Sequence, residues 1–265
     1  MSRSASDPVP SAEEQTPEKI RGMFSAITPA YDGLNHLFSV WLDHRWRRLA
    51  AREAVRGLHP CRRLLDLATG TGDLARQLAH AAGRKDPSIP SACHTSGPNR
   101  NEIAPKVLGI DFTRAMLKRA ASKYGREPLN WIEGDGLRLP LADSCLDAVT
   151  IAFGLRNMAD KAVALREMAR VTRPGGRVVV LEFSQPRNPL LRALYELYLF
   201  TIMPRVGRWI SGSEAYLYLA RSIRSFWTPD QLSGQMRQAG LGPIRAIPLL
   251  MGTVYLHVGV KPVAK

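Results

Sequence analysis

A short glycine turn between two acidic residues is the first place where the sequence suggests chemistry. The stretch "RLLDLATGTGDL", residues 63–74, runs from an apolar strand through Gly70 and Gly72 into a helix. Asp66 and Asp73 would repel a phosphate group, the GxxxxGK[ST] phosphate-binding pattern is absent, and GxGxxG is incomplete. The turn therefore indicates a ligand that approaches bare backbone and needs hydrogen-bond acceptors rather than donors.

Two further aspartates follow the next two predicted strands. "KVLGID" ends in Asp111, where a Rossmann-like fold places the acidic side chain that accepts from ribose hydroxyls. Asp135, in "EGDGLRLP", follows the third strand and can accept from an adenine amino group. A lone aspartate here is often only the cap of the next helix, a role open to Asp111. Together with Asp66 they favour a nucleoside without phosphates, S-adenosylmethionine, and hence a methyltransferase.

The elements that must position these residues alternate between strands and helices. Such alternation predicts an α/β fold with a mostly parallel sheet and helices on both faces. The expected strands are 62–68, 106–112, 129–135, 146–153, 175–183 and 253–262, and the expected helices are 72–82, 113–124, 160–172 and 228–241, the last capped by Thr228.

Around this core the composition predicts one domain, residues 20–265, after a disordered leader, residues 1–19. A helical segment at 20–58 precedes the first strand. The proline-bearing stretch 84–105 is expected to be an inserted surface loop, in which Cys93 and His94 lack chelating spacing. Residues 189–226, too long and too aromatic for a connector, are expected to form a helical cap over the substrate.

Net charge and cysteine content indicate the compartment and the kinds of partner that the protein could have, but they do not identify its function. The net charge of +14 and pI near 10.3 favour an anionic partner, nucleic acid or an acidic membrane surface, but an arginine-rich proteome would give the same values. The three cysteines show no CxxC spacing, which argues against a disulfide framework and a structural zinc site and predicts a cytoplasmic protein without a bound metal. No stretch approaches the roughly 20 apolar residues of a membrane-spanning helix.

Longer motifs make the chain resemble the UbiE/MenG family of quinone C-methyltransferases, from about Ile20 to Val260. The resemblance depends on "MFSAITPAYDGLNHLFS", "DLATGTGDLA", "TIAFGLRN", "VLEFSQP" and "SEAYLYLARSIRSFWTPDQL". It implies a class I, S-adenosylmethionine-dependent methyltransferase with a seven-stranded sheet. It also implies cofactor contacts at Thr71, Asp111, Asp135 and Gly136, whereas Ala152 stands where the family often has a serine.

The same resemblance implies transfer of a methyl group to a ring carbon of a reduced quinone. Arg156 and Asn157 follow the fourth strand, where open α/β sheets bind substrates, and we expect Arg156 to stabilise a phenolate. A structural clamp between loop and sheet is the alternative. Aromatic and polar residues of the helical segment and the cap are expected to line the substrate site or else only to pack; they are Tyr31, Asn35, His36, Tyr195, Tyr216 and Tyr218.

The expected substrate is demethylmenaquinol, with a benzoquinol precursor of ubiquinone, or both, as the alternative. The cap sequence "LLRALYELYLFTIMP" is amphipathic, and Arg205, Arg208, Arg221 and Arg224 follow it, so it can lie on an anionic bilayer at the inner face of the cytoplasmic membrane. Packing on the sheet or on a second subunit of a homodimer is the alternative. A non-catalytic cofactor-binding scaffold and an RNA methyltransferase are the competing functions; no RNA-binding module is recognisable, so no nucleic-acid partner is expected.

Overall fold

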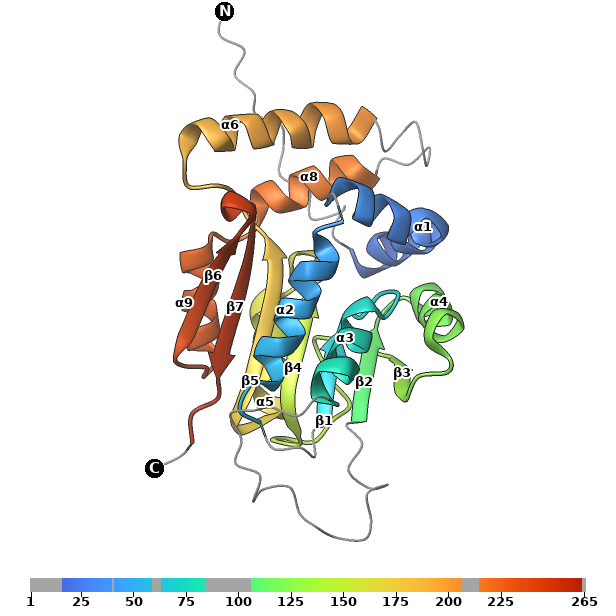
Figure 1. Cartoon of the computed structure of the whole chain (residues 1–265), viewed down its shortest axis with the longest axis vertical. Coiled ribbons are helices and arrows are strands. Elements are labelled where there is room, and N and C mark those ends of the chain that lie inside the picture. The colour runs from blue at the N-terminus through green and yellow to red at the C-terminus, as the bar shows by residue number, and fades with distance from the viewer. Residues whose placement is uncertain (1–15, 40, 59–62, 84–105, 206–214, 264–265) are drawn as a thin grey trace, which may run out of the picture.

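One seven-stranded sheet forms the centre of the protein (Figure 1). The computed structural model describes residues 16–39, 41–58, 63–83, 106–205 and 215–263. The strands follow one another along the sheet as β3, β2, β1, β4, β5, β7 and β6, and all neighbours are parallel except for the pairs that include β7. Their bounds are β1 Arg63–Leu67, β2 Lys106–Asp111, β3 Leu129–Glu133, β4 Leu146–Ala152, β5 Thr172–Phe183, β6 Ile244–Leu249 and β7 Val254–Val260.

Strand β6 is the element that the residue pattern missed, although the family resemblance implied a seventh strand. It lies at the edge of the sheet, paired only with β7, and most of its side chains are exposed or half-buried. An edge strand tolerates Pro248, which a central strand would not. Arg245 also interrupts the run of apolar residues by which a strand is recognised in the sequence. β5 also begins at Thr172, before the predicted start at 175.

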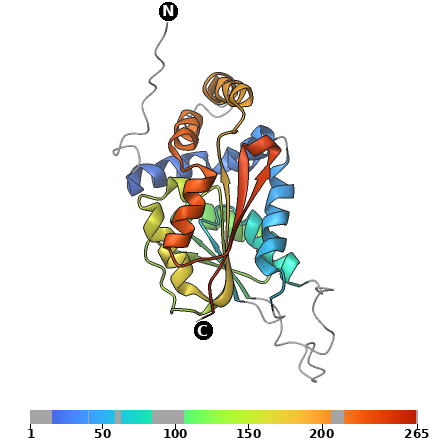
Figure 2. The same ribbon diagram turned by 90° about the vertical axis from the view of Figure 1, so that its left-hand side faces the viewer.

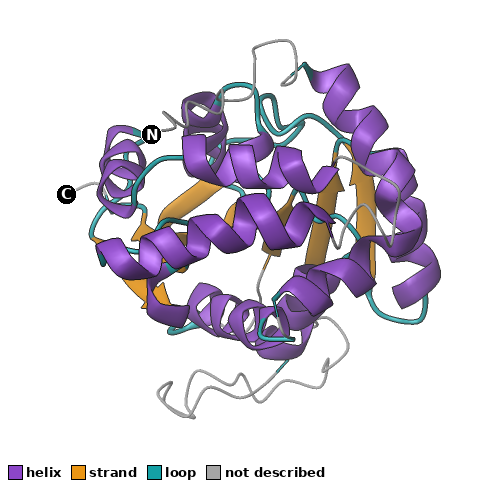
Figure 3. Ribbon diagram, turned by 90° about the horizontal axis from the view of Figure 1, so that it is seen from above, coloured by secondary structure: helices purple, strands orange, loops and turns teal. Residues whose placement is uncertain are grey.

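Helices cover both faces of the sheet, as predicted (Figures 2 and 3). α2 (Asp43–Val55) and α3 (Asp73–Ala82) bury alanine and leucine side chains against one face. α5 (Lys161–Val171) and α9 (Pro229–Gln238) do so against the other. Because both faces are covered, β1 and β4 are buried along almost their whole length.

The first helix corrects the predicted end of the leader. α1 (Pro17–Phe38) begins three residues before position 20, and the backbone N–H of Ile20 donates to the carbonyl oxygen of Thr16. Proline suits the first position of a helix because its missing N–H would have no partner there. α1 packs beside α4 (Arg114–Tyr124). Residues 1–15 and the predicted insertion 84–105 lie outside the described residues.

Within 189–226, helices lie above the carboxyl ends of the parallel strands (Figure 1). They are α6 (Pro189–Leu197), the π-helical turn η4 (Tyr198–Ile202) and α8 (Ala215–Ser225). Leu199 and Met203 pack against Ala220 and Ile223 in a small apolar cluster of their own. Below them, α9 begins with the predicted cap: the Thr228 hydroxyl accepts from the Gln231 N–H, and the Gln231 side chain accepts from the Thr228 N–H.

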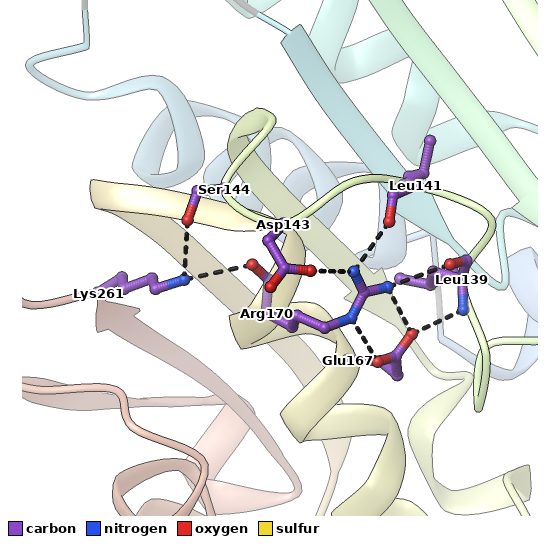
Figure 4. A network of polar contacts seen from close by, with 7 residues as sticks. All are labelled: Leu139, Leu141, Asp143, Ser144, Glu167, Arg170 and Lys261. Carbon is purple, nitrogen blue, oxygen red and sulfur yellow. Dashed lines mark hydrogen bonds and ion pairs between the residues drawn. The ribbon is translucent and has the colours of Figure 1, made fainter.

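The connection from β3 to β4 is held by Arg170, near the end of α5 (Figure 4). Its guanidinium donates to the carbonyl oxygens of Leu139 and Leu141, at 3.1 and 2.9 Å, and to the carboxylate of Asp143 at 2.6 Å. Glu167 completes the network by binding both the guanidinium and the backbone N–H of Leu139. One arginine thus fixes the segment that follows the predicted site residues Asp135 and Gly136.

Candidate active site

A pocket opens where β1 and β4 lie side by side and their following connections leave in opposite directions. Such a switch point, outside the carboxyl ends of the strands, is where open α/β sheets bind ligands. The space within it is about 920 Å³, part of it open to solvent. It is lined by the ends of four strands and by α1; the lining includes Ile20, Phe24, Gly70, Asp111, Phe112, Gly134, Asp135, Gly136, Ala152, Phe153 and Asn157.

Asp66 lies beneath the glycine turn, and its carboxyl group is turned into the protein. It is 1 % exposed, and it accepts hydrogen bonds from the hydroxyls of Thr69 at 2.7 Å and Thr150 at 2.9 Å. Burial raises the pKa of Asp66 from its ordinary value of 3.8 to about 7. Asp66 was predicted to contact the cofactor, but it is not part of the described pocket lining. We therefore assign it to support of the turn.

Asp111 lines the pocket and also ties the turn to β2. One carboxylate oxygen accepts from the N–H of Gly70 at 2.8 Å and the other from the N–H of Thr113 at 2.7 Å. The cap of α4 is Thr113, not Asp111. Burial raises the pKa of Asp111, while these two bonds favour the carboxylate. Each oxygen keeps a second lone pair, so the side chain can still accept from ligand hydroxyls.

Asp135 and the glycines beside it form the next side of the pocket. Gly134, Asp135 and Gly136 all belong to the lining, and an Asp135 oxygen accepts from the N–H of Leu137 at 2.9 Å. A Cβ atom on Gly136 would lie 2.8 Å from the Met158 side chain and 3.3 Å from that of Leu67. A larger residue there would therefore push into the pocket or its wall.

Thr71 and Gly72, both predicted to bind the cofactor, are not part of the described pocket lining. Thr71 is buried, and Gly72 is the first residue before α3, with a φ of 87°. Neither is part of the described lining, whereas Gly70 is. Within residues 70–72, Gly70 is thus the residue that belongs to the described lining, and Gly72 immediately precedes α3.

The lining fits a cationic nucleoside that carries no phosphate. Among its described residues are two aspartates and several glycines, and none of them is lysine, arginine or histidine. A phosphate would meet repulsion there, whereas ribose hydroxyls, an adenine amino group and a sulfonium centre would meet acceptors and apolar walls. Elsewhere in the described ranges, no group of three or more potential metal-ligating side chains comes together.

Arg156 and Asn157, predicted to be catalytic, lie on the 3-10 turn η3 (Leu155–Asn157), which follows β4. Asn157 lines the pocket, but Arg156 is buried behind it. Both side chains donate to the carbonyl oxygen of Phe153, which has an unfavourable positive φ of 57°. The clamp that the sequence left as an alternative is therefore present, and Asn157 also remains in position to touch a ligand.

Glu182 is the residue near this site that sequence reasoning did not single out. Its carboxylate accepts from the Arg156 guanidinium at 2.9 Å, from the Arg156 N–H at 3.3 Å and from the Phe183 N–H at 2.9 Å. It is 1 % exposed. The available signal was a charge inside the apolar strand "RVVVLEF", because a buried carboxylate needs a partner.

The expected substrate-lining residues are only partly described. Tyr195 of α6 is partly buried beneath the cap, close enough to Arg156 and Glu182 to interact with their charges, and burial raises its pKa. Tyr218 of α8 donates to the Asn157 side-chain oxygen at 3.4 Å. The side chains of Tyr31, Asn35, His36 and Tyr216 lie outside the described residues. Ile20 and Phe24 of α1 line the pocket.

Solved structures with this fold include methyltransferases. A SAM-dependent methyltransferase from Thermotoga maritima is 19% identical, with a TM-score of 0.56, over 91% of this chain and 99% of its own. The [4+2]-cyclase SpnF is 17% identical, with a TM-score of 0.62, over 94% and 97%. At these identities the likeness concerns the fold alone, and a cyclase among the matches shows that the fold does not fix the reaction. Fold and pocket together place the chain in the class I methyltransferase architecture.

Sequence comparison assigns the family. A model of the ubiE/COQ5 methyltransferase family matches residues 12–261, and the chain belongs to this family. Demethylmenaquinone methyltransferase of Mycobacterium marinum is 41% identical over 99% of both chains. The enzyme of the same name from Thermus thermophilus is 42% identical over 91% of this chain and all of its own. The ubiquinone/menaquinone biosynthesis C-methyltransferase UbiE of Syntrophotalea carbinolica is 40% identical over 90% and 92%. The protein is thus a SAM-dependent methyltransferase.

Proposed function

We propose that the protein transfers a methyl group from S-adenosylmethionine to a ring carbon of demethylmenaquinol. The observation that carries the proposal is the acidic, phosphate-excluding pocket in a chain of the ubiE/COQ5 family. Asp111 would accept from the ribose hydroxyls and Asp135 from the adenine amino group. The backbone at Gly70 and Gly136 gives the ligand close approach. When bound, S-adenosylmethionine supplies an electrophilic methyl group on a positively charged sulfur.

The protein's own contribution is to position and polarise the acceptor. A quinol ring carbon becomes nucleophilic as its neighbouring hydroxyl ionises, and orientation then supplies much of the acceleration. Asn157 borders the pocket and can orient that hydroxyl. Arg156 lies directly behind it, fixed by Glu182 and with its Nε buried without a hydrogen-bond partner among the described residues. We assign Arg156 a positioning and electrostatic role, since a guanidinium is too weak an acid to serve as a base at neutral pH.

The benzoquinol of ubiquinone biosynthesis is the alternative substrate. Relatives at similar identity carry names for one quinone or for both, and the two rings present similar reacting carbons. The relatives from Mycobacterium marinum and Thermus thermophilus are named for demethylmenaquinone alone. Their names favour demethylmenaquinol as the substrate. An isoprenoid quinol resides in the membrane, so we place the protein in the cytoplasm, in peripheral contact with the inner face of the cytoplasmic membrane.

The test is mass spectrometry of the lipid product. Purified protein is incubated with S-adenosylmethionine and dithionite, and with demethylmenaquinone or the demethylated benzoquinone precursor in parallel detergent samples. Methylation of the naphthoquinol alone is the expected result. Methylation of both would make the enzyme dual. Methylation of neither, with cofactor binding shown by calorimetry, would refute the quinol assignment and favour the scaffold or an RNA substrate.

A further inference from the structure

The exposed face of α6 is unusually apolar for a surface helix. Of its nine residues, all of which the structure describes, none is buried. Leu190, Leu194 and Leu197 are each more than half exposed, and Ile202 of η4 is nearly so. The opposite side of the same segment, with Leu199 and Met203, makes the packing contacts with α8. The leucines therefore do not contribute to the packing of the cap.

Two other segments expose apolar side chains at the same end of the molecule. The short turn η5 (Leu250–Gly252) joins β6 to β7, and Leu250 and Met251 are exposed there. Gly252 lies against Pro186, shortly before α6, because β5 ends where β7 begins. Trp41, exposed between α1 and α2, lies at this end as well, since Trp46 on the next turn packs on Phe153 after β4.

Together these residues account for most of the exposed large apolar side chains. In the described part of the chain there are nine, and seven lie at this end: Trp41, Leu190, Leu194, Leu197, Ile202, Leu250 and Met251. They come from three separate segments: α6 with η4, the turn η5, and the connection between α1 and α2. Ile132 and Val263 are the two that lie elsewhere. An apolar concentration of this kind marks an interaction surface.

We propose that these seven residues form a docking surface for an anionic lipid bilayer, and the proposal rests on the quinol function proposed above. Exposed leucine, methionine and tryptophan side chains on separate segments suit a fluid interface, which needs no complementary shape. The net charge of +14 complements anionic head groups. Docking at this end would bring the cap, which lies over the carboxyl ends of the strands, to the membrane that holds an isoprenoid substrate.

In this proposal the exposed leucines contribute more to membrane binding than the arginines that the sequence suggested. Of the four arginines that the sequence suggested as lipid contacts, Arg224 and Arg221 are half-buried within the cap, and Arg224 lies over the Phe200 ring. Arg205 is exposed, and its guanidinium donates to the carbonyl oxygen of Thr201. Arg192 is ion-paired with Glu196 on α6 itself. Arg208 lies outside the described residues. Insertion of apolar side chains should thus provide most of the affinity, and added salt should weaken binding only partly. None of the described helices is long and apolar enough to cross the bilayer.

The test compares two double variants by flotation with vesicles of phosphatidylcholine and phosphatidylglycerol. Leu194→Gln/Leu197→Gln removes two half-exposed leucines and keeps good helix formers, and we expect at least a tenfold loss of vesicle affinity. The control is Ile132→Gln/Val263→Gln, which should change vesicle affinity less than twofold. Ile132 and Val263 are 43% and 69% exposed, comparable with 56% for Leu194 and 54% for Leu197. Absence of wild-type binding, or equal losses in both variants, would overturn the proposal.

Two further readouts separate this surface from other roles. Methyl transfer to a quinol with a truncated, water-soluble tail should be equal in the wild type and the leucine variant, since docking is not needed there; a large loss would place α6 in the active site instead. A wild-type dimer in sedimentation velocity that becomes monomeric in the leucine variant, without vesicle binding, would assign the face to a second copy. Vesicle binding is measured without turnover, so failure of the quinol function would not be mistaken for failure of docking.

Discussion

The Nη1 atom of Arg156 lies 2.9 Å from Oε1 of Glu182, and both side chains are almost completely buried. The pair joins the turn after β4 to the end of β5, and the same guanidinium holds the carbonyl of Phe153. Phe183, the neighbour of Glu182, packs against Phe153 with ring centroids 4.6 Å apart. The wall of the pocket at Phe153 thus depends on an ion pair that does not itself line the pocket.

Glu182→Gln should be strongly destabilising, because it leaves the Arg156 charge buried without its partner. We expect the free energy of unfolding to fall by about 3 kcal/mol, measured by urea denaturation. Arg156→Met/Glu182→Leu removes both charges and should be more stable than Glu182→Gln while remaining poorly active. A loss below about 1 kcal/mol in Glu182→Gln would contradict the buried pair.

Asp111→Ala should weaken the binding of S-adenosylmethionine at least tenfold. The substitution removes the acceptor proposed for the ribose hydroxyls and also releases the N–H of Gly70 from its bond to β2. Isothermal calorimetry measures the change. Asp230→Ala is the control and should leave the affinity unchanged. Asp230 is an exposed residue of α9 and is paired with Arg187, which precedes α6. Equal affinities in the two variants would refute the ribose contact.

Asp66 should make stability depend on pH between about 4 and 7. Its pKa is about 7 in the folded protein, because of burial, and near 3.8 in the unfolded chain. Between these values the folded state holds a proton that the unfolded state has released, so the free energy of unfolding falls as pH rises and levels off above pH 7. From pH 5 to 8 the fall should be about 2 to 3 kcal/mol, at 1.36 kcal/mol per pKa unit.

Asp66→Asn tests this assignment, because asparagine carries no titratable group. Denaturation series at pH 5, 6, 7 and 8 should show a much shallower slope for the variant than for the wild type. Parallel slopes would mean that another group accounts for the pH dependence. The comparison of slopes is more informative than absolute stability, since the asparagine amide cannot accept from both Thr69 and Thr150 as the carboxylate does.

The sequence was sufficient to predict the core strands and the positions of Asp111 and Asp135, because both depend on local pattern. Continuous apolar runs define buried parallel strands, and parallel strands bring their carboxyl ends to one edge. The same reasoning could not separate Asp66 from the other two aspartates. All three lie within two residues of the end of a strand, and only the packing around Thr69 and Thr150 decides that Asp66 points inward.

What the sequence could not predict depends on contacts between distant segments. Glu182 and Arg156 are 26 residues apart, and nothing local pairs them. β6 is an edge strand, so its apolar periodicity is weak. The contribution of α1 to the pocket through Ile20 and Phe24 depends on how that helix packs beside α4, which the pattern of a single helix does not specify.

The glycine turn itself offers a final test, because the site of Gly72 is closed to any side chain. Its φ is +87°, and a Cβ atom there would lie 2.6 Å from the Trp131 ring. Gly72→Ala should therefore lower the free energy of unfolding by about 2 kcal/mol or more, from backbone strain and displacement of the indole. Gly234→Ala, in the middle of α9 with nothing within 4 Å, should instead raise it by up to about 1 kcal/mol. Opposite signs for the same substitution in urea denaturation would confirm that the turn, and not a general preference for glycine, requires this residue; a neutral Gly72→Ala would show that Trp131 can move aside.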